Sequence, residues 1–379
     1  MENNGHRVLI VAPSLDMAKN VSGVSAVTNF IIANNKECKY EHFLQGRSDE
    51  ESGAWKRVLR VWRNYRAWKA VINGNDNVND NLNKNGNEKI IHYNFPLDTP
   101  SIIRDFFFLR AAHKMRKRMV IHVHGGLYLF KEQKPYIIKK FLNEVFSMDC
   151  PFIVLSNKEK EQIQSTYHTK NVFVLPNCVE LPDWNDNDNQ NDNQNDNLNG
   201  NGDTLHILYL GRIEPNKGMD YLYDAMKELK GQNIKLHFAG IEQGANGYVE
   251  KYKALLGDRF IYEGVVAGKE KTALFRRCQV FVLPSLYEGL PMSLLESMSY
   301  GLVPLTTNVG SIGEYVKNGI NGLLLKVKDS HSITEALTTL INEKALVKQL
   351  SEAARHTIFS QLNPKEYIEK LNSIYAKTV

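Results

Sequence analysis

The chain has 379 residues, of which 42% are apolar, so it is long enough to bury two sizeable domain cores. It contains no stretch of about 18 apolar residues, which excludes a membrane-spanning helix, and its first apolar run, Arg7–Ala12, is too short for a signal peptide. Residues 1–184 carry a net charge of +7, residues 185–203 carry −5 and the rest carries +3, so we expect the first half to face something anionic.

Short β-branched runs predict strands, and helical patterns separate many of them. In the first half, strands are predicted over Arg7–Ala12, Lys89–Tyr93, Met119–Val123, Phe152–Leu155 and Val172–Leu175, and helices over Val24–Ala33 and Pro135–Phe146. In the second half, strands are predicted over Leu205–Leu210, Ile234–Ala239, Arg259–Tyr262, Val280–Leu283, Val303–Thr306 and Gly322–Val327, and helices over Met219–Lys230, Lys269–Arg277 and Ser293–Tyr300. The alternation predicts two α/β domains with parallel sheets, which bind ligands at the carboxyl ends of their strands.

Asparagine occupies every odd position from Asn73 to Asn87 and again from Asn185 to Asn201. Such tracts cannot bury apolar surface, so we interpret both as flexible loops, the second at or beside an interdomain linker. Interspersed Asp and Gly disfavour the alternative, an aggregating asparagine ladder. Asp186-Asn187-Asp188 arises from the repeat itself, and a flexible loop offers no fixed geometry for a metal ion.

The segment from Glu288 to Glu296 is the most informative motif in the sequence. It follows the predicted strand Val280–Leu283 directly, and Pro291 suits the first position of a helix that begins near Leu290. Free backbone N–H groups at such a helix start can bind a diphosphate. The alternative is a pair of surface glutamates that flank an amphipathic helix.

This segment resembles the signature of two glutamates separated by seven residues in retaining glycosyltransferases of family 4. The resemblance extends over Leu210–Gly218, Gly301–Pro304, Gly310–Glu314 and Asn318–Leu323. It implies the α/β GT-B fold, in which two Rossmann-like, doubly wound domains face a central cleft. Residues 1–184 would then form the acceptor-binding domain, 185–203 a loop near the linker, and 204–379 the nucleotide-sugar-binding domain, whose last helix could pack back on the first.

The resemblance also implies roles for residues of the second half. Arg212 and Lys217 would bind the donor diphosphate and stabilise the leaving group without a metal ion, as two cations on a strand-end loop can do. Glu296 would accept hydrogen bonds from the ribose, and Glu288 would bind the transferred sugar near the reacting centre. Gly289 and Leu290 complete the donor-binding set. The alternative for Arg212 and Lys217 is a pair of solvated surface cations.

In the first half, His124 follows a predicted strand and precedes a glycine pair, and it matches the family's histidine that contacts the donor sugar. His122 lies on the same strand face and would be either a supporting partner or a core residue. Gly23, in the loop after the first strand, resembles a residue of the family's glycine-rich loop near the diphosphate. The sequence has one glycine there where the family often has two.

Two stretches of the first half combine cations with aromatic residues. Residues 55–69 contain six cations, no acid and three tryptophans, and residues 106–118 join three phenylalanines to five cations. Such segments bind anionic membrane surfaces. The alternative is an amphipathic helix that packs its tryptophans on the core. No nucleic-acid motif accompanies either stretch, so nucleic acid is not expected as a partner.

We therefore expect retaining, metal-independent transfer of a sugar from a UDP- or GDP-linked donor to a saccharide or lipid-linked acceptor, in the synthesis of cell-surface polysaccharide or glycoconjugate. No cofactor is expected. Four separated cysteines favour ordinary thiols in a reducing cytoplasm, with peripheral contact at the inner face of the cell membrane. The alternatives are a sugar-nucleotide epimerase or a phosphorylase of the same fold, a non-catalytic partner subunit, and a membrane-surface scaffold.

Overall fold

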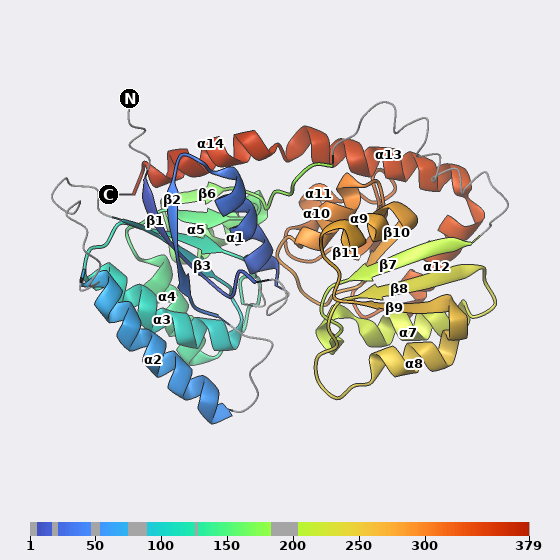
Figure 1. Cartoon of the computed structure of the whole chain (residues 1–379), viewed down its shortest axis with the longest axis horizontal. Helices are drawn as coiled ribbons and strands as arrows, with labels where there is room; N and C mark the ends of the chain where they lie inside the picture. Colours follow the sequence, from blue (N-terminus) through green and yellow to red (C-terminus); the bar gives the residue numbers. More distant parts are fainter. Residues whose placement is uncertain are drawn as a thin grey trace. The chain divides into compact units, whose positions relative to one another are not determined.

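The computed structural model describes residues 6–16, 22–46, 54–74, 89–125, 128–182 and 204–378, with the backbone alone for 54–57. Nearly all of both asparagine-rich tracts lies outside these residues. The chain divides into two compact units, one formed by Met1–Asn177 with Lys365–Val379 and the other by Cys178–Pro364 (Figure 1). The division thus falls after Asn177, whereas the sequence placed it at 184, and the last residues belong to the first unit.

The first unit is built on a parallel sheet of six strands in the order β2-β1-β3-β4-β5-β6. Its strands are β1 (Arg7–Ala12), β2 (Lys39–Leu44), β3 (Ile90–Phe95), β4 (Met119–Val123), β5 (Phe152–Val154) and β6 (Val172–Val174). Its helices are α1 (Gly23–Asn34), α2 (Ala54–Ile72), α3 (Thr99–Lys114), α4 (Tyr136–Phe146), α5 (Asn157–Tyr167) and α14 (Pro364–Tyr375).

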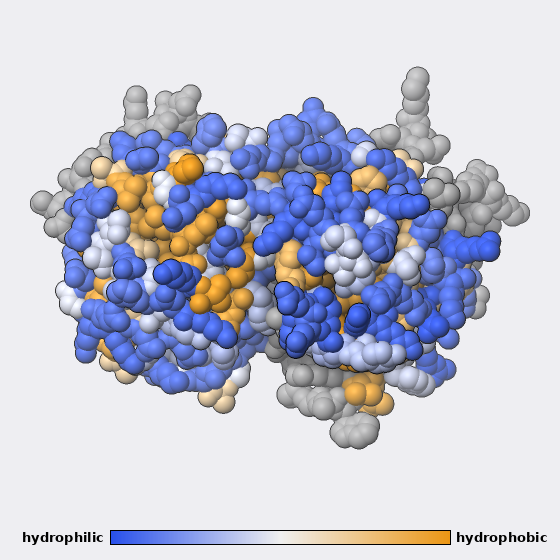
Figure 2. Space-filling view, turned by 180° about the vertical axis from the view of Figure 1, so that it is seen from behind, coloured by the Kyte–Doolittle hydropathy of each residue, from blue (hydrophilic) through white to orange (hydrophobic). Residues whose placement is uncertain are grey.

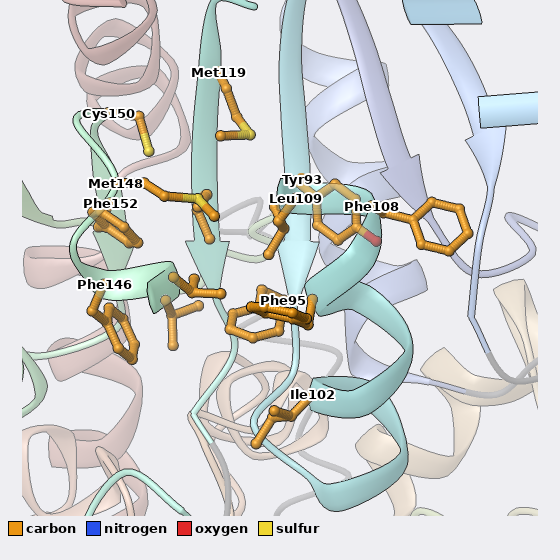
Figure 3. Packing of buried hydrophobic residues seen from close by; sticks show 14 of the residues in the cluster. Tyr93, Phe95, Ile102, Phe108, Leu109, Met119, Phe146, Met148, Cys150 and Phe152 are labelled. Carbon is orange, nitrogen blue, oxygen red and sulfur yellow. The ribbon is translucent and has the colours of Figure 1, made fainter. Parts of the chain in front are cut away.

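Alternate residues of these strands face different helices, as the two-residue period of a strand requires. One face packs on α2 to α5 in a core that includes Tyr93, Phe95, Phe108 and Phe146 (Figure 3). The opposite face meets α1 and α14, where the rings of Phe30 and Tyr367 pack edge to face. Burial on both faces explains why inner strands such as β1 and β5 read as continuous apolar runs in the sequence.

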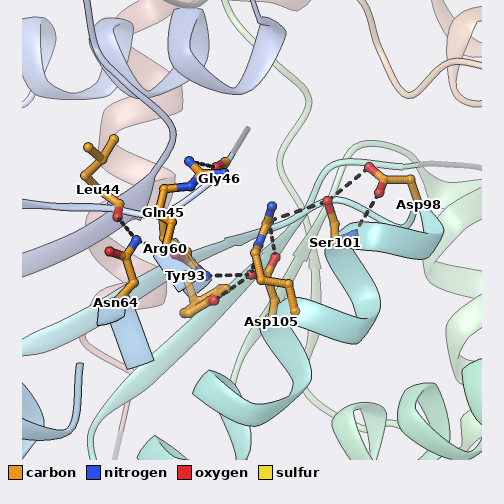
Figure 4. Close-up of polar contacts among 10 residues, drawn as sticks. Leu44, Gln45, Gly46, Arg60, Asn64, Tyr93, Asp98, Ser101 and Asp105 are labelled. Carbon is orange, nitrogen blue, oxygen red and sulfur yellow. Dashed lines mark hydrogen bonds and ion pairs between the residues drawn. The ribbon is translucent and has the colours of Figure 1, made fainter. Parts of the chain in front are cut away.

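A buried carboxylate joins α3 to the ends of β2 and β3. Asp105 is 1% exposed and forms an ion pair with Arg104, 2.6 Å from Nε to Oδ1. The Tyr93 hydroxyl and the Gln45 amide also donate to Oδ1, at 3.0 and 3.4 Å (Figure 4). The adjacent α2 is attached to the same region, because Arg60 donates to the Gly46 carbonyl over 2.8 Å.

The second unit contains another parallel six-stranded sheet, in the order β12-β11-β10-β7-β8-β9. Its strands are β7 (Leu205–Leu210), β8 (Ile234–Ala239), β9 (Phe260–Gly264), β10 (Val280–Leu283), β11 (Val303–Thr307) and β12 (Leu323–Leu325). Its helices are η2 (Pro215–Lys217), α7 (Met219–Glu228), α8 (Tyr248–Leu256), η3 (Gly257–Arg259), α9 (Gly268–Arg277), α10 (Met292–Ser299), α11 (Ile312–Tyr315), α12 (Ser330–Asn342) and α13 (Lys344–Gln361).

The predicted α/β architecture with parallel sheets is therefore confirmed. The prediction for Pro291 was wrong: it is the N-cap of α10 with ψ of 130°, and the helix begins one residue later at Met292. Among the described residues, no helix is both long and apolar enough to cross a bilayer. Hydrophilic residues cover much of the surface seen from behind, with hydrophobic residues gathered in patches between them (Figure 2).

Candidate functional site

Three loops at the carboxyl ends of β7, β10 and β11 meet in the second unit. A Cβ at Gly218 would lie 2.0 Å from the Pro284 carbonyl oxygen, and one at Gly310 would lie 2.3 Å from the Glu288 carbonyl oxygen. Both glycines have positive φ, +77° and +57°, so a side chain would be strained there as well as crowded. The backbones of the three loops therefore approach more closely than any other residue type permits.

Hydrogen bonds join the same loops. The Leu286 amide donates to the Asn216 carbonyl over 2.9 Å, and the Ser311 amide donates to the Gly289 carbonyl over 3.0 Å. The Asn216 side chain donates to the Tyr287 hydroxyl, also over 2.9 Å. The segment from 286 to 289 is thus held on both sides.

Lys217 and Glu288 form an ion pair at this junction, with 2.6 Å between Nζ and Oε1. The hydroxyl of the buried Ser285 donates to the same carboxylate oxygen over 2.7 Å. The other oxygen, Oε2, has no hydrogen bond to the described residues. The pair is largely shielded, with side chains 20% and 10% exposed, so its attraction is stronger than that of a surface pair.

Glu296 lies one to two turns along α10 and pairs with a different lysine. Its Oε1 is 2.8 Å from Nζ of Lys271, in the first turn of α9. The two helices are fixed side by side because Phe275 of α9 stacks on Tyr300, with 5.1 Å between ring centroids. Lys271 was not singled out in the sequence, since nothing there shows that α9 lies against α10.

Arg212 follows β7 in the loop that leads to Lys217. The buried Tyr209 hydroxyl donates to the Arg212 carbonyl, which fixes the backbone at that point. Gly289 is half-buried and Leu290 is buried beside the start of α10. Of the residues predicted to bind donor, Arg212, Lys217, Gly289, Leu290, Glu288 and Glu296 thus share one edge of the second sheet.

The two remaining predicted residues belong to the first unit. Gly23 is the first residue of α1, and a Cβ there would meet nothing within 4 Å. His124 follows β4, and its Nε2 lies 2.5 Å from Oδ1 of Asn94. Asn94 donates its own amide to the Val11 carbonyl, so Oδ1 accepts and His124 carries its hydrogen on Nε2. Burial lowers the pKa of His124 to about 3, which keeps the ring neutral.

Asn94 was not singled out in the sequence, because nothing there shows that β3 lies beside β4 and brings Asn94 to His124. Among the described residues, no three His, Cys, Asp or Glu side chains gather as metal ligands would.

Residues 190–357 match the family model described as "Glycosyl transferases group 1". A curated relative, UDP-Gal:alpha-D-GlcNAc-diphosphoundecaprenol alpha-1,3-galactosyltransferase from Escherichia coli, is 26% identical over 276 residues, which are 69% of each chain.

Solved structures resemble the whole chain at low sequence identity. A sucrose-phosphate synthase from Thermosynechococcus elongatus is 16% identical with a TM-score of 0.74 and 98% of each chain covered. Anabaena HepE in complex with UDP-glucose is also 16% identical, with a TM-score of 0.69 and coverage of 98% of this chain and 99% of that one.

The two parallel sheets and these neighbours show the GT-B fold. The family match and the curated relative show a glycosyltransferase that uses a nucleotide sugar as donor. Within this chain, the similarity to the group 1 glycosyltransferases covers residues 190–357.

Proposed function

We propose that this protein transfers a sugar from a UDP- or GDP-linked donor to a saccharide or lipid-linked acceptor, with retained anomeric configuration and without a metal ion. The observation that carries the proposal is the Lys217–Glu288 pair at the junction of three strand-end loops. Arg212 lies in the loop that leads from β7 to Lys217. Cations and backbone N–H groups at one sheet edge suit a diphosphate.

In the proposed reaction, Arg212 and Lys217 stabilise the negative charge that develops on the nucleotide diphosphate as the bond to the sugar breaks. Glu296 accepts hydrogen bonds from the ribose. Glu288 and His124 bind the transferred sugar, and the neutral ring of His124 accepts a hydrogen bond at Nδ1. The new bond forms on the face from which the diphosphate leaves, so the reaction needs positioned substrates and no covalent sugar–enzyme intermediate.

A lipid-linked acceptor is favoured by the Escherichia coli relative, which by its name acts on a diphosphoundecaprenol-linked sugar. An acceptor of that kind belongs to the synthesis of cell-surface polysaccharide or glycoconjugate. It would hold the enzyme at the inner face of the cell membrane.

The proposal is tested with a panel of UDP- and GDP-linked sugars. A donor should stabilise the protein against heat, because a ligand that binds the native state shifts unfolding by mass action. With that donor and its acceptor, the product should have the donor's anomeric configuration by NMR, and turnover should persist in EDTA. An inverted product, turnover that EDTA abolishes and manganese restores, or release of free epimerised sugar nucleotide would each contradict it.

The exposed side of α2 supports a second proposal, contact with an anionic membrane surface. Val58, Leu59 and Trp62 are 59%, 64% and 58% exposed, whereas Trp68 is fully buried in the core. Phe107 of the neighbouring α3 is 47% exposed. The core-packing alternative thus applies to Trp68, whereas Trp62 faces solvent and is available to a membrane surface.

Cations accompany these apolar side chains. Arg63, Arg66 and Lys69 are exposed, and the Arg66 guanidinium lies 4.8 Å from the centre of the Trp62 ring. Each cation near an anionic bilayer contributes about 1 kcal/mol, and the apolar side chains add burial. Arg60 is a poor probe of this surface, because it is anchored to Gly46.

Reversal of Arg63, Arg66 and Lys69 to Glu should release the protein from vesicles that contain phosphatidylglycerol. Reversal of Lys230, Lys253 and Lys348, which are exposed on the second unit, is the control and should leave vesicle binding unchanged. If the wild-type protein does not sediment with these vesicles at low salt, the membrane proposal fails and the acceptor is soluble.

A further inference from the structure

A chain of buried polar groups runs beneath the β4 strand end of the first unit. The Tyr375 hydroxyl of α14 lies 2.7 Å from Nδ1 of His92, and Nε2 of His92 lies 3.2 Å from Nδ1 of His122. All three side chains are fully buried. His122 is two residues before His124 on the same strand face, and the two imidazole rings are 4.2 Å apart at an angle of 32°.

The direction of this hydrogen-bond chain follows from its members. A phenol is a stronger donor than an imidazole N–H, and an imidazole nitrogen is a stronger acceptor than a phenol oxygen, so Tyr375 donates to Nδ1 of His92. Burial lowers the pKa of His92 to about 3, so its ring is neutral and carries its one hydrogen on Nε2. That hydrogen is donated to Nδ1 of His122.

The far end of the chain agrees with this direction. Asn35 donates its amide to the Tyr40 oxygen over 2.9 Å, and Asn35 is itself oriented because its Oδ1 accepts from the Glu37 amide. The Tyr40 hydrogen is then free to point at the Tyr375 oxygen, 3.5 Å away. If Tyr375 donated to Tyr40 instead, the Tyr40 hydrogen would have no acceptor within this series of hydrogen bonds.

His122 receives a hydrogen bond at Nδ1 and must therefore carry its own hydrogen on Nε2. This buried atom has no hydrogen-bond partner among the described residues. A buried donor without a partner lowers stability, so the arrangement is not what core packing alone would favour. The unpaired Nε2–H group is explained if the His122 ring has a functional role beside His124.

We propose that Tyr375, His92 and His122 are positioning residues for His124: the chain fixes the His122 ring in its Nε2–H form, and that ring supports the His124 ring in the orientation that binds the transferred sugar. The proposal rests on the role of His124 in the proposed function. It gives α14 a part in the sugar-binding half of the reaction, through the hydrogen bond between Tyr375 and His92.

Tyr375→Phe tests this with the loss of one oxygen atom. Without the phenol, nothing holds His92 in its present form, and His122 can carry its hydrogen on either nitrogen. Tyr367→Phe removes a hydroxyl from the same helix and is the control. The protein is labelled with ¹⁵N-histidine, and long-range ¹H–¹⁵N spectra then report which ring nitrogen of His122 carries hydrogen.

The wild-type protein and Tyr367→Phe should show His122 with hydrogen on Nε2, and Tyr375→Phe should show a mixture of the two forms. In steady-state assays, Tyr375→Phe should lower kcat about tenfold with the donor KM unchanged, because donor binding by the second unit is unaffected. Tyr367→Phe should keep kcat within about twofold.

A wild-type His122 with hydrogen on Nδ1 would overturn the proposal. So would a Tyr375→Phe variant with the wild-type His122 spectrum or with the kcat of the control. If the wild-type protein turns over no nucleotide sugar, the proposed function fails. The nitrogen spectra need no turnover and still decide the state of the histidine chain.

Discussion

Lys217 and Glu288 are bonded to each other in the free protein, with 2.6 Å between Nζ and Oε1. A donor diphosphate that binds Lys217 must therefore compete with a carboxylate already in place. Ser285, which donates to the same oxygen, can keep Glu288 in position when Lys217 turns to the phosphate. The pair thus holds both side chains ordered before the donor arrives, which reduces the entropy lost on binding.

The first prediction concerns the two cations of this site. Arg212→Ala should slow transfer at least tenfold, roughly 1.4 kcal/mol, through a lost phosphate contact. Lys217→Ala should be worse, because it also leaves the Glu288 carboxylate facing the diphosphate without a counter-charge. Lys227→Ala, at an exposed residue paired with Asp224, is the control. Near-wild-type kcat/KM for both site variants would show that Arg212 and Lys217 are solvated surface cations that do not bind the diphosphate.

The second prediction separates chemistry from binding. Glu288→Gln should lower kcat, because in the proposed reaction Glu288 binds the sugar whose charge changes. Glu296→Gln should raise the donor KM with little change in kcat, because the ribose is remote from the breaking bond. Steady-state kinetics with varied donor distinguishes the two effects. The reverse pattern would show that the two glutamates have been assigned to the wrong parts of the donor.

The third prediction is that Lys271 acts only through Glu296. Lys271→Met removes the ammonium that holds Oε1 of Glu296 and should raise the donor KM about fivefold at constant kcat. Combined with Glu296→Gln, it should add nothing further, since a positioning residue has no effect once its partner is gone. Lys269→Met, also in the first turn of α9, is the control. Additive effects in the double variant would mean that Lys271 touches the donor itself.

The fourth prediction uses two glycines with left-handed backbone. Gly310→Ala would place a Cβ 2.3 Å from the Glu288 carbonyl oxygen, whereas Gly319→Ala would meet nothing within 4 Å. Both should lose about 1 kcal/mol of stability from the positive φ, but only Gly310→Ala should move the 288–289 backbone and weaken donor binding. Calorimetric titration with the donor compares them. Equal affinities in both variants would show that the close approach does not shape the site.

The fifth prediction concerns pH. Burial lowers the pKa of His92 and His124 to about 3 and holds that of His122 well below its usual value, whereas the unfolded chain binds these protons below about pH 6.5. The free energy of unfolding should therefore fall as pH drops below about 6.5, by up to about 1.4 kcal/mol per pH unit for each histidine.

Urea unfolding at pH 7 and pH 5.5, followed by the fluorescence of the buried Trp68, measures this loss. His113→Gln, at an exposed position of α3, should leave the pH dependence unchanged. A midpoint that does not move between the two pH values would show that these histidines titrate normally.

The sequence predicted most of the second unit, because its strands are short apolar runs between clear helical patterns. Three of them, β7, β8 and β10, have the predicted bounds. It missed β2, whose residues Lys39–Leu44 are all exposed or half-buried. An edge strand with Lys, Glu and His on it lacks the apolar run that marks an inner strand.

The residues of the candidate site likewise fall into those that the sequence predicted and those that it missed. Glu288 and Glu296 stand out because a fixed spacing after a strand is visible in the sequence. Lys271 and Asn94 do not stand out, because each matters through a hydrogen bond to a residue of another element, Glu296 and His124 respectively. Only the folded structure brings these partners together. Gly310 could be noted as a glycine but not as the residue that meets the Glu288 carbonyl.

The place of α14 in the first unit has a consequence for synthesis on the ribosome. Residues 178–364 form a continuous unit that is complete before the last helix is translated. The first unit emerges earlier, but the part of its sheet around His92 that α14 covers stays exposed until Tyr375 has been added. The half that is made first is thus finished last, and in the interval its apolar face is available to chaperones or to misassembly.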